Sequence, residues 1–68
     1  MSPQQARIIA HMVAHGSITG KEAVTKLGML DLRKRISELR RLGWDIVDEW
    51  EEHDDGMHKR YFLRRKDA

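Results

Sequence analysis

Residues 17–43 decide the fold, and they read SITGKEAVTKLGMLDLRKRISELRRLG. Thr19 and Glu22 have the spacing of a capping box, which predicts a helix that starts one or two residues after Thr19 and ends before Gly28. Gly28 opens a three-residue turn, and Asp31 is placed to cap a second helix that runs to the end of this stretch. Two helices joined by so short a turn are typical of a helix-turn-helix, whose second helix lies in the major groove of DNA.

The second helix is predicted to have one apolar face. Its apolar stripe spans about 120° of arc at about 100° per residue, the width expected of a face that packs on a core. The stripe consists of Leu32, Ile36, Leu39 and Leu42. On the helix before it, the predicted buried residues are Ala23, Val24 and Leu27.

The opposite face of the second helix is basic, with Arg33, Lys34, Ser37 and Arg41 on it and Arg40 at its edge. Guanidinium groups can bond guanine O6 and N7 in pairs or bind phosphates. We predict that Arg33 and Ser37 contact base edges. Lys34, Arg40 and Arg41 are predicted to hold the DNA backbone. The alternative is a solvated charged face.

Further phosphate contacts are expected from the start of the first helix of the pair, where Thr19, Lys21 and the free backbone amides lie. More distant cations add nonspecific attraction, namely Lys26, Arg64, Arg65 and Lys66. If about five phosphates are neutralised, the logarithm of affinity falls with the logarithm of salt concentration at a slope near about −4 to −5.

A further helix is predicted upstream, from Pro3 to about His15. Ser2 and Gln5 form a capping box around Pro3, and Gly16 stands where a left-handed residue ends a helix. Its predicted buried stripe contains Ala6, Ile9, Ala10 and Val13, widened by Ile8 and Met12. Residues 17–19 are expected to be extended, as a link or a small strand.

Beyond Gly43 the apolar period changes from 3.6 to 2, and Asp55-Gly56 is a hairpin signal. A turn centred there predicts the cross-strand pairs Glu52–Lys59, Glu51–Arg60 and Trp50–Tyr61. It places Ile46, Trp50, Tyr61 and Leu63 on one face, with Trp50 and Tyr61 in the wing core. The expected fold class is α+β, a three-helix winged helix-turn-helix with a C-terminal hairpin wing. Residues 1–68 form one domain, with 64–68 as a basic tail.

Arg35 borders the apolar stripe of the second helix rather than its basic face. The hairpin register also turns Asp48 inward. We predict an Arg35–Asp48 ion pair that ties this helix to the wing; otherwise Arg35 extends its guanidinium to solvent.

Charge is unevenly distributed, although the net charge is only +2. Seven of the 11 acidic residues lie between Asp45 and Asp55, and all 13 Lys and Arg residues lie outside that segment. The basic surface can meet nucleic acid, whereas the acidic wing would repel it. We expect the acidic wing and an exposed Phe62 to offer a second surface for a protein partner or a homodimer. The acidic residues concerned are Asp48, Glu49, Glu51 and Glu52.

The histidines stand in two pairs: His11 and His15 at i, i+4, and His53 and His58 beside the hairpin turn. The first spacing could chelate zinc, but the sequence has no third ligand at a fixed spacing. We therefore expect no metal and no cofactor. No nucleophile–base pair or phosphate-binding glycine loop is visible, so we do not expect an enzyme. The absence of cysteine and of a long apolar run favours a soluble cytosolic protein.

The combined pattern resembles small winged helix-turn-helix proteins of bacteriophages and prophages. It runs Gly-Ser-Ile-Thr-x-x-Glu-Ala, Leu-Gly, then Leu-x-x-Arg-Ile-x-x-Leu-Arg-x-x-Gly-Trp-x-Ile, and ends in Tyr-x-Leu. The resemblance implies DNA binding in phage gene control or excision, in the cytoplasm of a bacterial host. We expect a sequence-specific binder of double-stranded DNA that regulates transcription. The alternatives are an excisionase-like architectural protein and a protein-interaction module that inhibits or adapts host machinery through its acidic wing.

Overall fold

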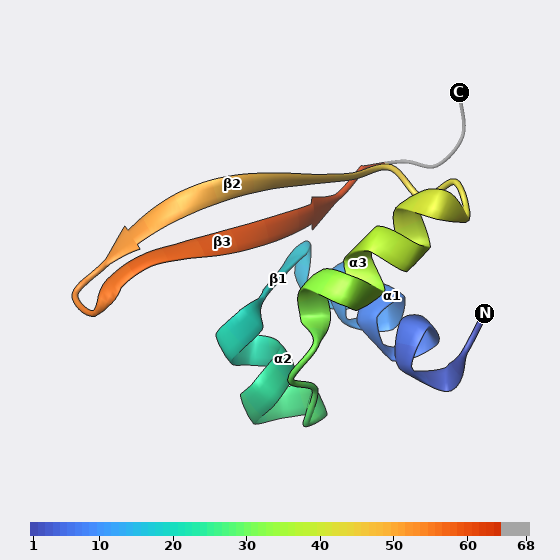
Figure 1. The fold of residues 1–68 in the computed structure, drawn as a ribbon, viewed down its shortest axis with the longest axis horizontal. Coiled ribbons are helices and arrows are strands. Elements are labelled where there is room, and N and C mark those ends of the chain that lie inside the picture. Colours follow the sequence, from blue (N-terminus) through green and yellow to red (C-terminus); the bar gives the residue numbers. More distant parts are fainter. Residues whose placement is uncertain (65–68) are drawn as a thin grey trace.

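The computed structural model describes residues 1–64, which form three helices and three strands. Their order is α1 (Pro3–His15), β1 (Ser17–Thr19), α2 (Gly20–Leu27), α3 (Leu32–Arg41), β2 (Ile46–His53) and β3 (Gly56–Leu63). The strands form an antiparallel sheet of order β1-β3-β2. The helices gather beside one end of the β2–β3 hairpin, the wing, whose turn extends away from them (Figure 1). The predicted fold class is confirmed. Residues 65–68 of the predicted tail lie outside the described residues.

The helix boundaries follow from local capping chemistry. Both predicted capping boxes form: the Ser2 hydroxyl accepts from the Gln5 amide at 3.2 Å, and the Thr19 hydroxyl accepts from the Glu22 amide at 3.1 Å. Gly28 ends α2 with a φ of 66°, a left-handed conformation that suits glycine. Asp31 occupies the predicted N-cap position of α3, but its side chain makes no capping hydrogen bond. Asp31 instead pairs with Arg35.

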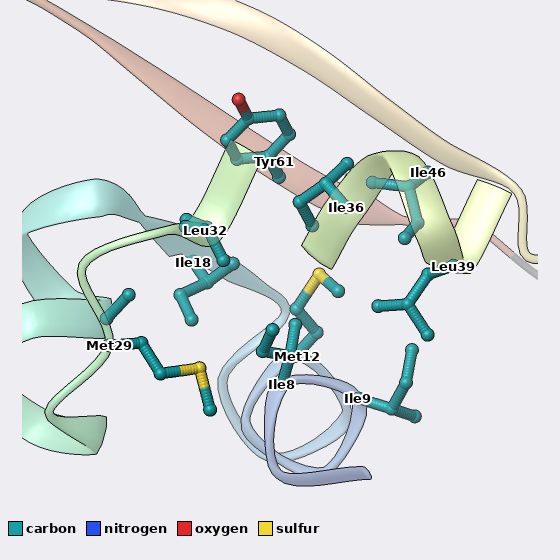
Figure 2. Packing of buried hydrophobic residues seen from close by; sticks show 11 residues of the cluster. Ile8, Ile9, Met12, Ile18, Met29, Leu32, Ile36, Leu39, Ile46 and Tyr61 are labelled. Atoms are coloured by element: carbon teal, nitrogen blue, oxygen red, sulfur yellow. The ribbon is translucent and has the colours of Figure 1, made fainter. Parts of the chain in front are cut away.

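The core lies where α3 crosses α1 and the base of the sheet (Figure 2). Ile36 and Leu39 of α3 are fully buried, together with Ile8 and Met12 of α1. Side chains of the sheet close the cluster from the other side, and the most buried of these are Ile18, Ile46 and Tyr61. Burial of this side of α3 leaves its opposite face outward.

The predicted apolar stripe of α1 is rotated in the structure. On α1 the buried residues are Gln5, Ile8, Ile9 and Met12, whereas Ala6, Ala10 and Val13 are exposed. The polar Gln5 joins the buried side because its amide donates to Glu38 of α3 at 2.9 Å. Burying larger side chains also removes more apolar area from water than burying alanines.

Two further residues expected in the core are exposed, namely Val24 on α2 and Leu42, which is 52 % exposed. Leu42 caps the C-terminus of α3, which ends at Arg41, two residues before the predicted end at Gly43.

The hairpin register differs from the prediction by two residues. Trp50 lies opposite Lys59, and Asp48 lies opposite Tyr61. The turn is Asp54-Asp55, and the positive φ, 124°, falls on Gly56 directly after it. The two turn residues have negative φ, and the glycine follows them. The Asp55-Gly56 dipeptide in the sequence does not show whether the glycine lies within the turn or directly after it.

A shift of two residues keeps every side chain on its predicted face. Ile46 and Tyr61 are therefore buried as expected, and Leu63 packs against the core. The predicted place of Trp50 in the wing core is wrong, because its side chain is 63 % exposed.

We expect Leu39→Ala to destabilise the domain by about 2–5 kcal/mol, because it empties a fully buried site. Leu42→Ala is the matched control, and its effect should stay within about 0.5 kcal/mol because the side chain is exposed. Urea unfolding followed by circular dichroism measures both. Equal effects of the two substitutions would contradict this placement of α3.

Candidate nucleic-acid interface

The outward face of α3 carries four exposed polar residues, Arg33, Lys34, Ser37 and Arg41. Within residues 1–64, none of these side chains forms an ion pair or a hydrogen bond. Three positive charges and a hydroxyl therefore face solvent on one side of α3, while the buried side of α3 anchors the helix in the core. The structure brings together these four of the seven predicted DNA-binding residues.

Arg35 contributes to the fold rather than to this face. Its guanidinium lies 3.1 Å from the Asp31 carboxylate and 3.0 Å from that of Glu38. The predicted Arg35–Asp48 ion pair is wrong. Hydrogen bonds from Gln5 and Arg35 hold the pKa of Glu38 below its ordinary value. These contacts fix the flank of α3 that faces α1.

Arg40 makes the link to the wing that was predicted for Arg35. Its Nε donates to the Ile46 carbonyl at 3.0 Å, and its terminal nitrogen lies 3.3 Å from the Asp48 carboxylate. Arg40 and Arg35 stand on opposite flanks of α3, and the wing lies on the Arg40 side. Its guanidinium is therefore engaged within the protein and is not aligned with the free cations.

At the start of α2, Lys21 is exposed but Thr19 is buried. The Thr19 hydroxyl accepts from the Glu22 amide, and the Glu22 carboxylate accepts from the Thr19 amide at 3.0 Å. Thr19 therefore positions the helix start. Lys21 and Lys26 border a groove of about 330 Å³ between α2 and the outer side of the wing. Lys26 is also exposed.

The acidic wing is partly neutralised by its own chain. Three of its seven acidic residues form ion pairs with Arg or Lys, namely Asp45 with Arg64, Asp48 with Arg40 and Lys59, and Glu51 with Arg60. Asp55 contacts the His58 ring, and Glu51 also contacts the His53 ring; these contacts are ion pairs only when the histidine is protonated. The Glu51–Arg60 contact, predicted as a directly opposed pair, forms diagonally at 2.6 Å. It lowers the pKa of Glu51. Within residues 1–64, Glu49, Glu52 and Asp54 are left without an ion pair.

Phe62 is half-buried rather than exposed. It lies on β3, the middle strand of the sheet, opposite Val47 on β2 and Ser17 on β1. Strands on both sides cover more of its surface than a two-stranded hairpin would, and the sequence alone left β1 uncertain. The aromatic residue that the wing exposes is Trp50.

A second groove separates the wing from the N-terminal end of α3. It has a volume of about 540 Å³. Arg33 and Leu30 line one wall, and Trp50, Met57 and Lys59 line the other. No sequence pattern indicated this groove, because residues far apart in the chain form it.

The histidines of each pair are in ring contact, tilted at 42° for His11 and His15 and edge to face at 80° for His53 and His58. The rings of His11 and His15 are 4.5 Å apart, and those of His53 and His58 are 4.8 Å apart. Burial between α1 and α2 is the largest cause of a lowered pKa for His11, and the neighbouring His15 adds to it. Its Nε2 lies 3.8 Å from the Glu22 carboxylate, which opposes the shift.

Replacing Arg40 tests its structural assignment. We expect Arg40→Ala to destabilise the domain by about 1–2 kcal/mol, through loss of a hydrogen bond to a carbonyl and of a partly exposed ion pair. Arg41→Ala removes a cation without an ion pair and should change stability by less than about 0.5 kcal/mol. Urea unfolding compares the two variants. An Arg40→Ala protein as stable as wild type would contradict the assignment.

Stability should also depend on pH through His11. Its pKa in the folded state lies below the ordinary value of 6.5, so the unfolded chain binds more protons between these two values. The stabilisation is present above about pH 6.5 and is lost as the pH falls through the folded-state pKa. Melting temperatures measured from about pH 7.5 to 5 should therefore fall less for His11→Gln than for wild type. A decline in His11→Gln identical to that of the wild type would refute the role of His11.

Comparison with known proteins agrees with this geometry. The family model of the winged helix-turn-helix domain matches residues 3–66. No curated protein and no solved structure matches the chain. No helix among residues 1–64 has the length and apolar character needed to cross a membrane. The family suggests a DNA partner. Because the match spans nearly the whole chain, this protein belongs to the winged helix-turn-helix domain family.

Proposed function

We propose that this protein binds double-stranded DNA sequence-specifically, with α3 in the major groove. One observation carries the proposal: the exposed face of α3 holds three cations that no residue in 1–64 neutralises, and this helix is the second of a helix-turn-helix. Unneutralised charge favours a polyanion, because binding releases the counterions condensed on DNA. An α-helix fits the major groove, where base edges can be distinguished.

The residues of α3 divide into two roles in this proposal. Arg33 and Ser37 lie at the wing side of the exposed face and contact base edges. Lys34 and Arg41 hold phosphates, and Lys21 adds a phosphate contact from the start of α2. Arg40 and Thr19 act indirectly, because their side chains hold the wing and the start of α2 in place.

The biological role that we propose is transcription control, in a phage or prophage context within the bacterial cytoplasm. One module of this size buries limited surface on DNA, so useful specificity requires a second copy or adjacent sites. The rival interpretation, a protein-interaction module, has less support. Asp48 and Glu51 of its presumed surface are ion-paired, and Phe62 is half-buried.

Substitutions on α3 test the DNA interface. Fluorescence anisotropy with a duplex selected from genomic fragments should show about 5- to 150-fold weaker binding for Arg33→Ala, and relaxed preference at one base pair. Lys34→Ala should weaken binding to all sequences and reduce the salt slope by about 1.

Arg7→Ala is the matched control, because Arg7 is an exposed arginine on α1 without an ion pair among residues 1–64. It should bind as the wild type does. The proposal fails if the wild-type protein binds no selected duplex, or if Arg33→Ala and Arg7→Ala bind equally well.

A further inference from the structure

Large apolar side chains are concentrated around the groove between α3 and the wing. Leu30 is 88 % exposed, Trp50 is 63 % exposed and Met57 is 57 % exposed, and all three line this groove. Buried Leu32 and Tyr61 also line it. Exposed apolar clusters bordered by polar groups mark contact surfaces. The groove is therefore a candidate for contact with a ligand.

The hairpin register holds Trp50 at this surface. Trp50 lies opposite Lys59, one step on the same face beyond the Asp48–Tyr61 pair. Tyr61 packs on the core, whereas Trp50 is exposed and lines the groove across from Leu30 and Arg33. The ammonium of Lys59 lies 4.8 Å from the centre of the indole ring, a cation–π contact that restricts one side of the ring.

Charge around the groove favours an anionic occupant. Asp48 lies 3.3 Å from a nitrogen of Arg40 and 3.7 Å from that of Lys59. On the other wall, Asp31 is paired with Arg35, whereas Arg33 has no ion pair among residues 1–64. On the face of β2 that carries Trp50, Asp48 and Glu52 are the acidic residues. Of these two, Glu52 has no ion pair among residues 1–64.

Arg33 belongs both to this groove and to the exposed basic face of α3. A ligand bound along α3 therefore continues past the wing. Duplex DNA has the matching chemistry, since its phosphates suit the cations and its sugars suit indole and thioether groups, and a base face becomes available where a base step is opened.

We infer that the wing contacts the DNA minor groove through an apolar surface formed by Trp50 and Met57, with the indole stacked at a partly opened base step. This inference rests on the proposed function. Apolar side chains inserted between base steps unstack them and kink the duplex. The wing thereby bends the DNA. Its turn, Asp54-Asp55, is acidic, so this contact does not depend on a basic residue at the tip.

Such a contact adds a form of specificity that α3 does not supply. Opening a base step costs least at flexible pyrimidine–purine steps such as TA and CA. The preferred sites therefore carry such a step at a fixed distance from the bases that Arg33 reads.

The test compares affinity and DNA bending in full-length variants. Bending is measured by energy transfer between dyes at the two ends of the selected duplex. Trp50→Ala should bind about 5- to 150-fold more weakly, with an unchanged salt slope because no charge is lost, and should bend the duplex less. Trp50→Phe should restore much of both. Val13→Ala removes apolar surface from a residue on α1 that is 71 % exposed, and should match the wild type.

Intrinsic fluorescence gives an independent readout. Binding of DNA should quench wild-type tryptophan emission, and Trp50→Phe should lose most of that change. Circular dichroism verifies that each variant is folded, as expected for substitutions at exposed positions.

The inference is overturned if Trp50→Ala keeps the wild-type affinity and bend while Arg33→Ala loses binding; the proposed function then stands alone. It is equally overturned if sedimentation shows a dimer that Trp50→Ala dissociates while bending is unchanged, since the groove then binds a second copy. A wild-type protein that binds no duplex removes the proposed function and this inference together.

Discussion

The structure depends on the burial of one side of α3. Ile36 and Leu39 are fully buried against α1, and the base of the sheet covers them through Ile46 and Tyr61. A 68-residue chain can form only one small core, so this contact determines the orientation of α3. The orientation in turn selects the residues that face solvent. The candidate DNA interface is thus a direct consequence of core packing.

Ion pairing divides the cations of α3 into two groups. Arg35 and Arg40 lie on opposite flanks of α3. Arg35 pairs with Asp31 and Glu38, and Arg40 pairs with Asp48. The cations between these flanks have no ion pair within residues 1–64. The Arg40–Asp48 pair links α3 to β2, and Glu38, which pairs with Arg35, also accepts a hydrogen bond from Gln5 of α1. The same contacts neutralise acidic residues that lie beside the exposed face. Stability and electrostatic preference for a polyanion thus come from the same contacts.

The wing shows why net acidity along a sequence is a poor guide to surface charge. Seven acidic residues in one segment suggest repulsion of DNA, yet ion pairs with Arg and Lys within the chain neutralise three of them. What the wing exposes toward α3 is Trp50, Met57 and Lys59. The sequence did not reveal that Trp50 is exposed. Alternation along a strand assigns each side chain to a face of the sheet, but it does not show which residues of that face the helices cover.

The sequence by itself determined the helix starts and the helix-turn-helix, because capping boxes such as Thr19–Glu22 and the left-handed Gly28 are local interactions. It also determined the faces of the strands, since alternation survives a shift of two residues. Only the tertiary structure decided which flank of α3 meets the wing, and hence that Arg40 rather than Arg35 pairs with Asp48. Periodicity gives the angle of each residue about its own helix, whereas packing against the other elements decides what lies at that angle.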